Sequence, residues 1–276
     1  MKAAAFDYLR PRDLKEAVRR LAQSDGYVKL IAGGQSLGPM LNLRLVRPSL
    51  LVDVSRLEPL CAIEDRGDRW RIGAAVTHAR IEDAGDALAG CRLLQEVARD
   101  IAHRAVRNRG TIGGSMAHAD PAADWPLALS VLDAEVQLQG TTGQRAIPAD
   151  RFMLGAFSTA LREDELLLAV DVPKAAPAAR AGYYKFCRKP GEFAEASAAV
   201  FLNQERAVAR IFLGALNGAP LPLPELAREI AMRGAAAATP EALGEALAGA
   251  LPKLDPIERR MRVAVLGRAL QQVFRA

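Results

Sequence analysis

The chain contains 276 residues, 50% of them hydrophobic and 25% charged, and it carries a net charge of +5. This composition is ordinary for a soluble globular protein with a substantial core. The positive charge is small and no basic run accompanies it, so it does not indicate a nucleic-acid-binding protein.

Cysteine spacing and apolar run length exclude further classes. Cys61, Cys91 and Cys187 lie far apart and form no C-x-x-C motif. This argues against a disulfide framework, a zinc site or an iron–sulfur cluster held by this chain alone. No apolar run is long enough for a membrane span, and residues 1–12 do not resemble a secretory signal. We therefore expect a cytoplasmic protein without a membrane span.

Residues 1–55 predict a strand, a loop, a helix and a second strand in series. After a short N-terminal strand or arm, apolar residues at helical spacing predict a helix that Pro11 opens and that stops near Asp25 and Gly26. Residues 27–32 are expected to be a buried strand and 50–54 a second strand, with a short helix or turn at 37–45 between them. The loop after the first strand then lies at its carboxyl end, where α/β proteins tend to bind ligands.

Residues 56–173 predict hairpins and helices in alternation. Alternating residues at 62–76 and 135–147 favour hairpins, and Thr77 is a plausible helix N-cap. Helices are expected at 92–103 and 124–132, a loop at 152–159 and a strand at 165–172.

The last third of the chain predicts a strand meander followed by helices. An alanine- and proline-rich linker at 173–180 precedes strands expected at 182–188, 196–203 and 207–215. Two helices are expected to close the chain, one within 225–251 and one at 256–274. We therefore divide the chain into a domain at 1–173, with subdomains of about 1–55 and 56–173, and a C-terminal domain at 174–276.

Two glycine-bearing stretches, 31–36 and 109–115, each combine two adjacent glycines with a following hydroxyl residue. Glycine allows positive φ and close approach of a ligand, and successive backbone N–H groups in such turns form anion sites. A lone Gly-Gly pair is most often only a turn, and neither stretch is a G-x-G-x-x-G or Walker motif. Together, they predict a backbone-amide cradle for a diphosphate.

Residues 32–45 and 107–124 closely resemble the two FAD loops of the molybdenum hydroxylase flavoprotein family. This family includes the medium subunit of carbon monoxide dehydrogenase and the FAD domain of xanthine dehydrogenase. The resemblance implies an α+β chain, with a two-subdomain PCMH-type FAD-binding fold and a C-terminal subdomain of antiparallel sheet and helices. It implies non-covalent FAD, because neither glycine stretch contains the histidine or cysteine that related oxidases use for covalent attachment.

The resemblance also implies a function and partners. The chain would take electrons from the [2Fe–2S] clusters of a small subunit to FAD and pass them to NAD, a quinone or oxygen. A large subunit would hold the molybdopterin, and the complex would be a dimer of heterotrimers. Two other functions remain open: a stand-alone flavin oxidoreductase and a non-catalytic nucleotide-binding assembly module.

Several candidate residues have a structural alternative. Asp124 could accept hydrogen bonds from ribose or cap a helix, and Lys185 could face solvent or lie near the flavin. Tyr183 or Tyr184 could pack against the ring. The resemblance favours the cofactor role, and no catalytic or metal-binding residue is expected in this chain. The cofactor-binding residues it implies are Lys29, Leu30, Ile31, Ala32, Gly33, Gly34, Gln35, Ser36, Ile101, Thr111, Ile112, Gly113, Gly114, Ser115, Asp124, Leu167, Tyr183 and Lys185.

Other polar groups carry weaker expectations. The three histidines, His78, His103 and His118, show no metal-binding spacing, and structural roles are expected for them. A basic cluster precedes the second glycine stretch. It could be a solvated face, neutralise a diphosphate or dock a partner, and its members are Arg99, Arg104, Arg107 and Arg109.

Overall fold

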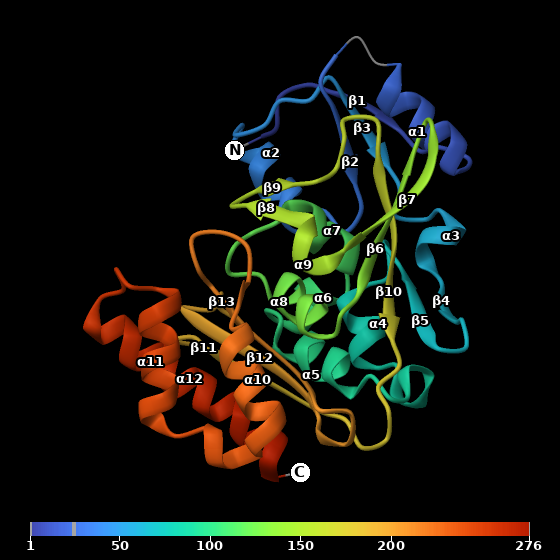
Figure 1. The fold of residues 1–276 in the computed structure, drawn as a ribbon. Helices are drawn as coiled ribbons and strands as arrows, with labels where there is room; N and C mark the ends of the chain where they lie inside the picture. The colour runs from blue at the N-terminus through green and yellow to red at the C-terminus, as the bar shows by residue number, and fades with distance from the viewer. Residues whose placement is uncertain (1, 24–25, 276) are drawn as a thin grey trace.

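The computed structural model describes residues 2–23 and 26–275, shown in Figure 1. The chain forms three successive regions: a small parallel sheet, a five-stranded antiparallel sheet with helices, and a four-stranded sheet covered by the last helices. Mixed helices and mostly antiparallel sheets confirm the expected α+β class.

The N-terminal region is a parallel sheet in the order β1-β3-β2. Helix α1 follows β1 and begins where Asp13 accepts a hydrogen bond from the backbone N–H of Glu16 at 2.7 Å. The expected stop at Asp25 lies outside the described residues. Strand β2 is half-buried and not buried as expected, because it lies at the edge of the sheet. The elements are β1 Asp7–Leu9, α1 Leu14–Ala22, β2 Val28–Ile31, α2 Leu37–Asn42 and β3 Leu50–Asp53.

The middle region is an antiparallel sheet in the order β4-β5-β10-β6-β7, with helices packed beside it. Thr77 caps α4 as expected, accepting from the N–H of Arg80. Every residue of α8 is buried, so this helix is surrounded by other elements. The elements are α3 Glu58–Cys61, β4 Ile63–Asp65, β5 Arg69–Gly73, α4 His78–Glu82, η1 Gly85–Leu88, α5 Arg92–Asp100, α6 Arg104–Arg107, α7 Ile112–His118, α8 Asp124–Val131, β6 Glu135–Gly140, β7 Gly143–Pro148 and β10 Leu166–Pro173.

Residues 152–159 are not the expected loop. Helix α9, Ala149–Phe152, leads directly into a hairpin of β8, Met153–Gly155, and β9, Ser158–Thr159. Phe157 makes the tight reversal by adopting a φ of 55°, a conformation that a bulky residue rarely takes and that sequence patterns do not reveal.

The C-terminal region is a sheet in the order β11-β12-β13-β14, with three closing helices in the described chain where two were expected. The extra break falls at Gly234, with a φ of 58°, and at Thr239, which caps the next helix. The short strand β14 was not anticipated. The elements are β11 Arg180–Phe186, β12 Ala196–Asn203, η2 Gln204–Arg206, β13 Val208–Gly214, β14 Leu221–Pro222, α10 Pro224–Arg233, η3 Gly234–Ala237, α11 Pro240–Ala250 and α12 Pro256–Arg275.

The C-terminal sheet joins two apolar cores. Tyr183, Ala199 and Phe212 pack into the main core, which also contains α8, whereas Ala198 and Leu213 belong to a second core with α10–α12. Adjacent strand residues point to opposite faces, so one sheet connects the closing helices to the middle region. None of the helices within the described ranges is long and apolar enough to cross a membrane.

Candidate cofactor-binding site

The two glycine stretches touch in the folded chain. A Cβ added to Gly33 would lie 2.0 Å from the carbonyl oxygen of Arg109 and 2.8 Å from the Cα of Gly110. Only glycine permits two backbones to approach this closely. We call this meeting of Gly33 with Arg109 and Gly110 the glycine contact. This contact confirms that the two glycine stretches lie side by side. Arg109 Nε also donates to Gly33 O, and these two residues are 76 positions apart in the sequence.

The first stretch presents unpaired backbone donors. Within the part of the chain that the structure describes, the N–H groups of Gly33, Gly34, Gln35 and Ser36 donate to no protein atom. Gly34 adopts a φ of +70°, the left-handed conformation found in turns whose successive N–H groups face a common side. The Ser36 side chain is exposed and makes no cap hydrogen bond to α2. This arrangement fits an anion such as a diphosphate.

Most N–H groups of the second stretch already donate to protein atoms, and within the described chain the exception is that of Thr111, so the expected row of free amides is absent there. Ile112 donates to the carbonyl oxygen of Val76 at 3.1 Å, and Gly113 donates to that of Ala74 at 3.0 Å. Within the first turn of α7, Gly114 N–H donates to Thr111 Oγ1 at 3.0 Å. Ser115 N–H donates to Thr111 O. The side chain of half-buried Ser115 and the exposed backbone of Gly114 remain accessible at this stretch.

His78 links the second stretch to helix α8. The backbone N–H of His78 donates to Gly110 O at 2.9 Å, and its ring Nδ1 accepts from Trp125 Nε1 at 3.0 Å. Burial, assisted by the nearby positive charge of Arg107, lowers the pKa of His78 to about 4. The imidazole is therefore neutral at pH 7, with its proton on Nε2. The sequence did not single out this role, because the contact joins residues 47 positions apart.

A buried polar cluster lies where α8, α5 and β11 meet. Lys185 Nζ lies 3.1 Å from Asp124 Oδ1 and 3.0 Å from the backbone oxygen of Asp100, and Tyr183 donates its hydroxyl hydrogen to Asp124. Burial raises the pKa of Asp124, which the charge of Lys185 opposes. Asp124 is not the N-cap considered from sequence, because Ala123 holds that position. Lys185 does not face solvent: its side chain is 5% exposed.

The two tyrosines point to opposite sides of β11. Tyr183 faces α8, and its ring is buried in the main core. Burial raises the pKa of Tyr183 well above its usual value, so the hydroxyl stays protonated. Tyr184 instead lies against α12, where its hydroxyl accepts from Arg268, whose guanidinium also lies 4.9 Å from the ring centroid. Tyr183 is the tyrosine on the side of Asp124.

The remaining predicted residues take varied positions. Ile101 ends α5 and is half-buried, and Leu167 is buried in β10 beside an irregularity in its pairing with β6. Leu30 and Ala32 pack against the main core, and half-buried Ile31 lies with them in this stretch. Lys29 Nζ lies 5.3 Å from the ring centroid of Tyr27 and not at the glycine contact.

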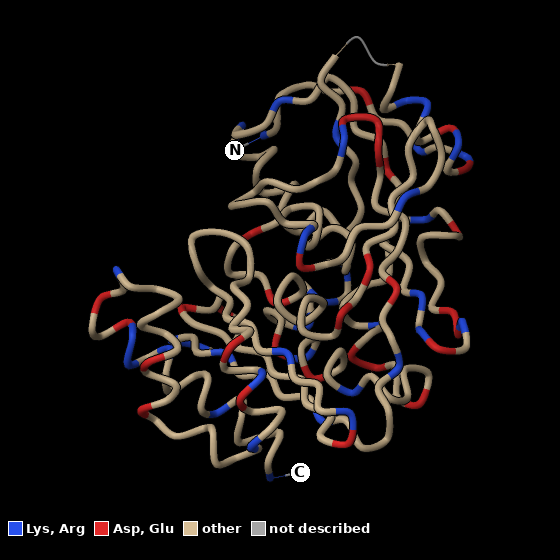
Figure 2. The backbone as a smooth tube through the Cα atoms, viewed as in Figure 1, with Lys and Arg blue, Asp and Glu red and all other residues tan. Residues whose placement is uncertain are grey.

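The basic cluster divides into structural and accessible members. Arg104 and Arg107 form ion pairs with Glu82, each at 2.8 Å, and so hold α6 against α4. Arg109 is exposed beside Gly33 and adds a positive charge at the glycine contact. Figure 2 shows Lys and Arg interspersed with Asp and Glu over the whole molecule.

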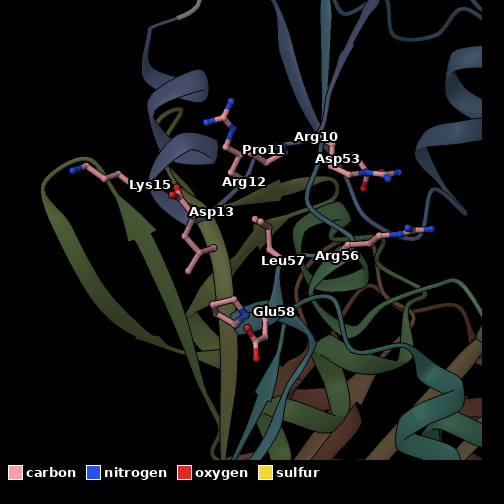
Figure 3. Close-up of a pocket in the computed structure, with 11 residues that line it drawn as sticks. Arg10, Pro11, Arg12, Asp13, Lys15, Asp53, Arg56, Leu57 and Glu58 are labelled. Carbon is pink, nitrogen blue, oxygen red and sulfur yellow. The ribbon is translucent and has the colours of Figure 1, made fainter.

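A separate cavity of about 560 Å³ lies near the ends of β1 and β3, and Figure 3 shows its lining residues. Asp53 accepts from Ser55 N–H, Tyr8 and Arg10 there. Burial raises the pKa of Asp53, but these hydrogen bonds outweigh it, and the net effect lowers the pKa. Basic and acidic groups mix in the lining, which contains none of the predicted cofactor residues; it consists of Arg10, Pro11, Arg12, Asp13, Leu14, Lys15, Asp53, Arg56, Leu57, Glu58 and Pro59.

Comparison with known proteins identifies the family of the chain. The model of a family described as the FAD binding domain in molybdopterin dehydrogenase matches residues 4–175. The chain is 36% identical over 254 residues to the carbon monoxide dehydrogenase medium chain of Hydrogenophaga pseudoflava, covering 92% of this chain and 88% of that relative. It is 39% identical over 220 residues to the 6-hydroxypseudooxynicotine dehydrogenase complex subunit alpha of Paenarthrobacter nicotinovorans, covering 79% and 74%.

Solved structures give the same result. A chain of the Cu,Mo-CO dehydrogenase superimposes with a TM-score of 0.92 at 31% identity, and the match covers 100% of both chains. A chain of quinoline 2-oxidoreductase from Pseudomonas putida 86 gives 0.89 at 31% identity, covering 100% of this chain and 99% of the other. The likeness therefore extends through the C-terminal sheet and helices.

Proposed function

The chain belongs to the family of FAD-binding domains in molybdopterin dehydrogenases, and from that membership we propose that it is the FAD-binding medium subunit of a multi-subunit molybdenum hydroxylase. A large subunit would hold the molybdopterin and oxidise the substrate. A small subunit with [2Fe–2S] clusters would deliver electrons to FAD on this chain, and an external acceptor, NAD, a quinone or oxygen, would remove them. The relatives that are named as medium chain or complex subunit support this assignment.

The unpaired N–H groups of the first stretch carry the proposal. Four successive donors, from Gly33 to Ser36, have no acceptor among the described residues and suit an acceptor-rich partner such as the diphosphate of FAD. Exposed Arg109 adds positive charge at the same place. Neither stretch contains a histidine or cysteine, which supports non-covalent binding.

The residues of this chain position the cofactor and set its electrostatics. When bound, FAD supplies the redox chemistry, because it accepts single electrons and releases them in pairs. The first stretch would hold the diphosphate, with Thr111 and Ser115 adding hydroxyl groups across the glycine contact. Lys185, held by Asp124 and Asp100, would place a fixed positive charge near the flavin and so favour its reduced, anionic form.

Three finer assignments belong to the same proposal. The complex is a dimer of heterotrimers located in the cytoplasm.

The domain boundary falls after residue 173, with subdomains of about 1–55 and 56–173 before it and a C-terminal domain at 174–276. The end of β10 at Pro173 and the start of β11 at Arg180 support this boundary. The implied FAD contacts are residues 29–36 and 111–115 with Ile101, Asp124, Leu167, Tyr183 and Lys185.

A visible absorption spectrum of the purified chain tests the function. We expect a flavin spectrum that moves entirely into the supernatant after acid precipitation and is identified there as FAD. If the chain is colourless, added FAD should lose its fluorescence on binding. A flavin that stays in the pellet would contradict non-covalent binding, and a chain that neither contains nor binds FAD would overturn the proposal.

A further inference from the structure

The side chain of His78 has a hydrogen-bond donor for which the described part of the chain provides no acceptor. The side chain belongs to a residue that is 5% exposed, and Nδ1 already accepts from Trp125. Because the imidazole is neutral, its remaining proton is on Nε2. Among the described residues, no protein atom accepts a hydrogen bond from this Nε2. Within the described ranges, the fully buried side-chain N and O atoms without a partner are Arg259 Nε and Arg262 Nε, so His78 Nε2 keeps some accessible surface and a ligand oxygen can reach it.

The position of this donor indicates its partner. A Cβ added to Gly110 would lie 2.8 Å from His78 Nε2, so the ring edge is directed at the backbone of the glycine contact. Gly33, the first of the residues with unpaired N–H groups, meets Gly110 on the same contact. The glycine contact therefore collects donors from two parts of the chain, and only glycine at 110 leaves the ring edge uncovered.

We propose that His78 is a positioning residue for FAD, whose Nε2–H donates a hydrogen bond to an oxygen of the cofactor at the glycine contact. The inference rests on the proposed function, because FAD is the acceptor-rich ligand expected there. Trp125 determines which nitrogen carries the proton: its N–H requires a lone pair on Nδ1 and so leaves the proton on Nε2.

The surroundings keep the ring neutral and fixed. Arg107, on α6, repels a second proton, and its own charge is paired with Glu82 on α4. Trp125 lies next to Asp124 in α8, so the same imidazole that would hold FAD at the glycine contact also holds the start of the helix that carries Asp124. His78 thus connects the diphosphate side of the site with the Lys185 side.

The test compares FAD affinity in the full chain and three variants. His78→Phe fills the same space without a donor, and we expect its Kd for FAD to rise about tenfold, the loss of roughly one hydrogen bond to a charged group. His78→Gln keeps a donor and an acceptor and should recover part of the affinity. Trp70→Phe is the matched control, because it also loses one ring N–H bond, that to Ala89 O at 3.0 Å, away from the glycine contact.

Ring nitrogen NMR separates a binding role from a structural role. In ¹⁵N-labelled chain at pH 7, His78 should show a neutral ring with the proton on Nε2, and FAD should shift that N–H signal. If wild type binds FAD but the His78 signal stays unchanged and His78→Phe binds as wild type does, the inference is wrong and the proposed function stands. If wild type binds no FAD, both are wrong.

Discussion

The two glycine pairs look alike in sequence but differ in the hydrogen bonding of their backbone N–H groups. The pairs are Gly33 with Gly34 and Gly113 with Gly114. The N–H groups of the first pair find no acceptor among the residues that the structure describes, whereas Gly113 and Gly114 donate theirs to Ala74 O and Thr111 Oγ1. In the proposed site, the first stretch is the binding surface and the second is mainly the scaffold against which that surface is held. The same residue pattern therefore serves two purposes, which only the partners of each N–H distinguish.

The scaffold role of the second stretch predicts the largest effect, at Gly113. A Cβ there would lie 2.5 Å from Ala74 Cβ and 2.7 Å from Ala74 O, between two backbones that cannot easily separate. We expect Gly113→Ala to lower the free energy of unfolding by roughly 3 kcal/mol, measured by urea denaturation. Unchanged stability would contradict the assignment of this stretch as scaffold.

His78, which is hydrogen-bonded to the second stretch at Gly110 O, should make the stability of the chain depend on pH. Its pKa is about 4 in the folded chain and about 6.5 when unfolded, so folding disfavours its protonation. The stabilisation is complete above pH 6.5 and is lost as the pH falls toward 4, by a total on the order of 3 kcal/mol.

His78→Gln isolates this contribution from other groups. Asp124 has a raised pKa in the folded chain and therefore acts in the opposite direction. We expect the unfolding free energy of wild type to fall more than that of His78→Gln between pH 7 and pH 5. Parallel pH profiles would show that His78 is charged or exposed.

The binding role of the first stretch predicts a different outcome at Gly34. Its φ of +70° disfavours alanine by roughly 1–2 kcal/mol, and the strain would turn the N–H groups away from their common side. Gly34→Ala should weaken FAD binding at least tenfold while the chain stays folded, measured by quenching of FAD fluorescence. Gly38→Ala is the matched control, because a Cβ there meets no atom of the described residues within 4 Å. Equal affinities of the two variants would remove the distinction between the stretches.

Ser36 gives the smallest expected effect. Its exposed hydroxyl bonds to no protein group in the described chain, so Ser36→Ala should leave thermal stability unchanged. If the hydroxyl adds a donor to the diphosphate, the Kd for FAD should rise about threefold, a typical loss for one exposed hydrogen bond. Isothermal titration with FAD measures this, and an affinity equal to wild type would limit the binding surface to backbone groups.

Local patterns predicted most elements because periodicity, turns and caps are local. Thr77 as a cap and Leu93, Leu94 and Val97 as the buried face of α5 follow from a few neighbouring residues. The break at Gly234 depends on a backbone conformation that composition does not report, and the reversal at Phe157 violates the usual preference.

The site was predictable only in part, for a related reason. The glycine pattern and the resemblance located both stretches, but neither could say that Gly113 N–H is already used by Ala74. His78 was left as structural because its role depends on Trp125 and Gly110, which are distant in the sequence. The alternation of side chains along a strand predicts that Tyr183 and Tyr184 face opposite sides of β11. Only the packing of α8 and α12 against the sheet determines that Tyr183 is the one on the side of Asp124.

The ion pair between Asp124 and Lys185 has a consequence for the order of events during synthesis. The two residues are 61 positions apart, so Asp124 leaves the ribosome well before the strand that supplies its partner. Until then, its carboxylate cannot take its buried place without a large desolvation cost, so the start of α8 cannot pack as it does in the finished chain. We therefore expect the cofactor to bind only after translation has passed β11.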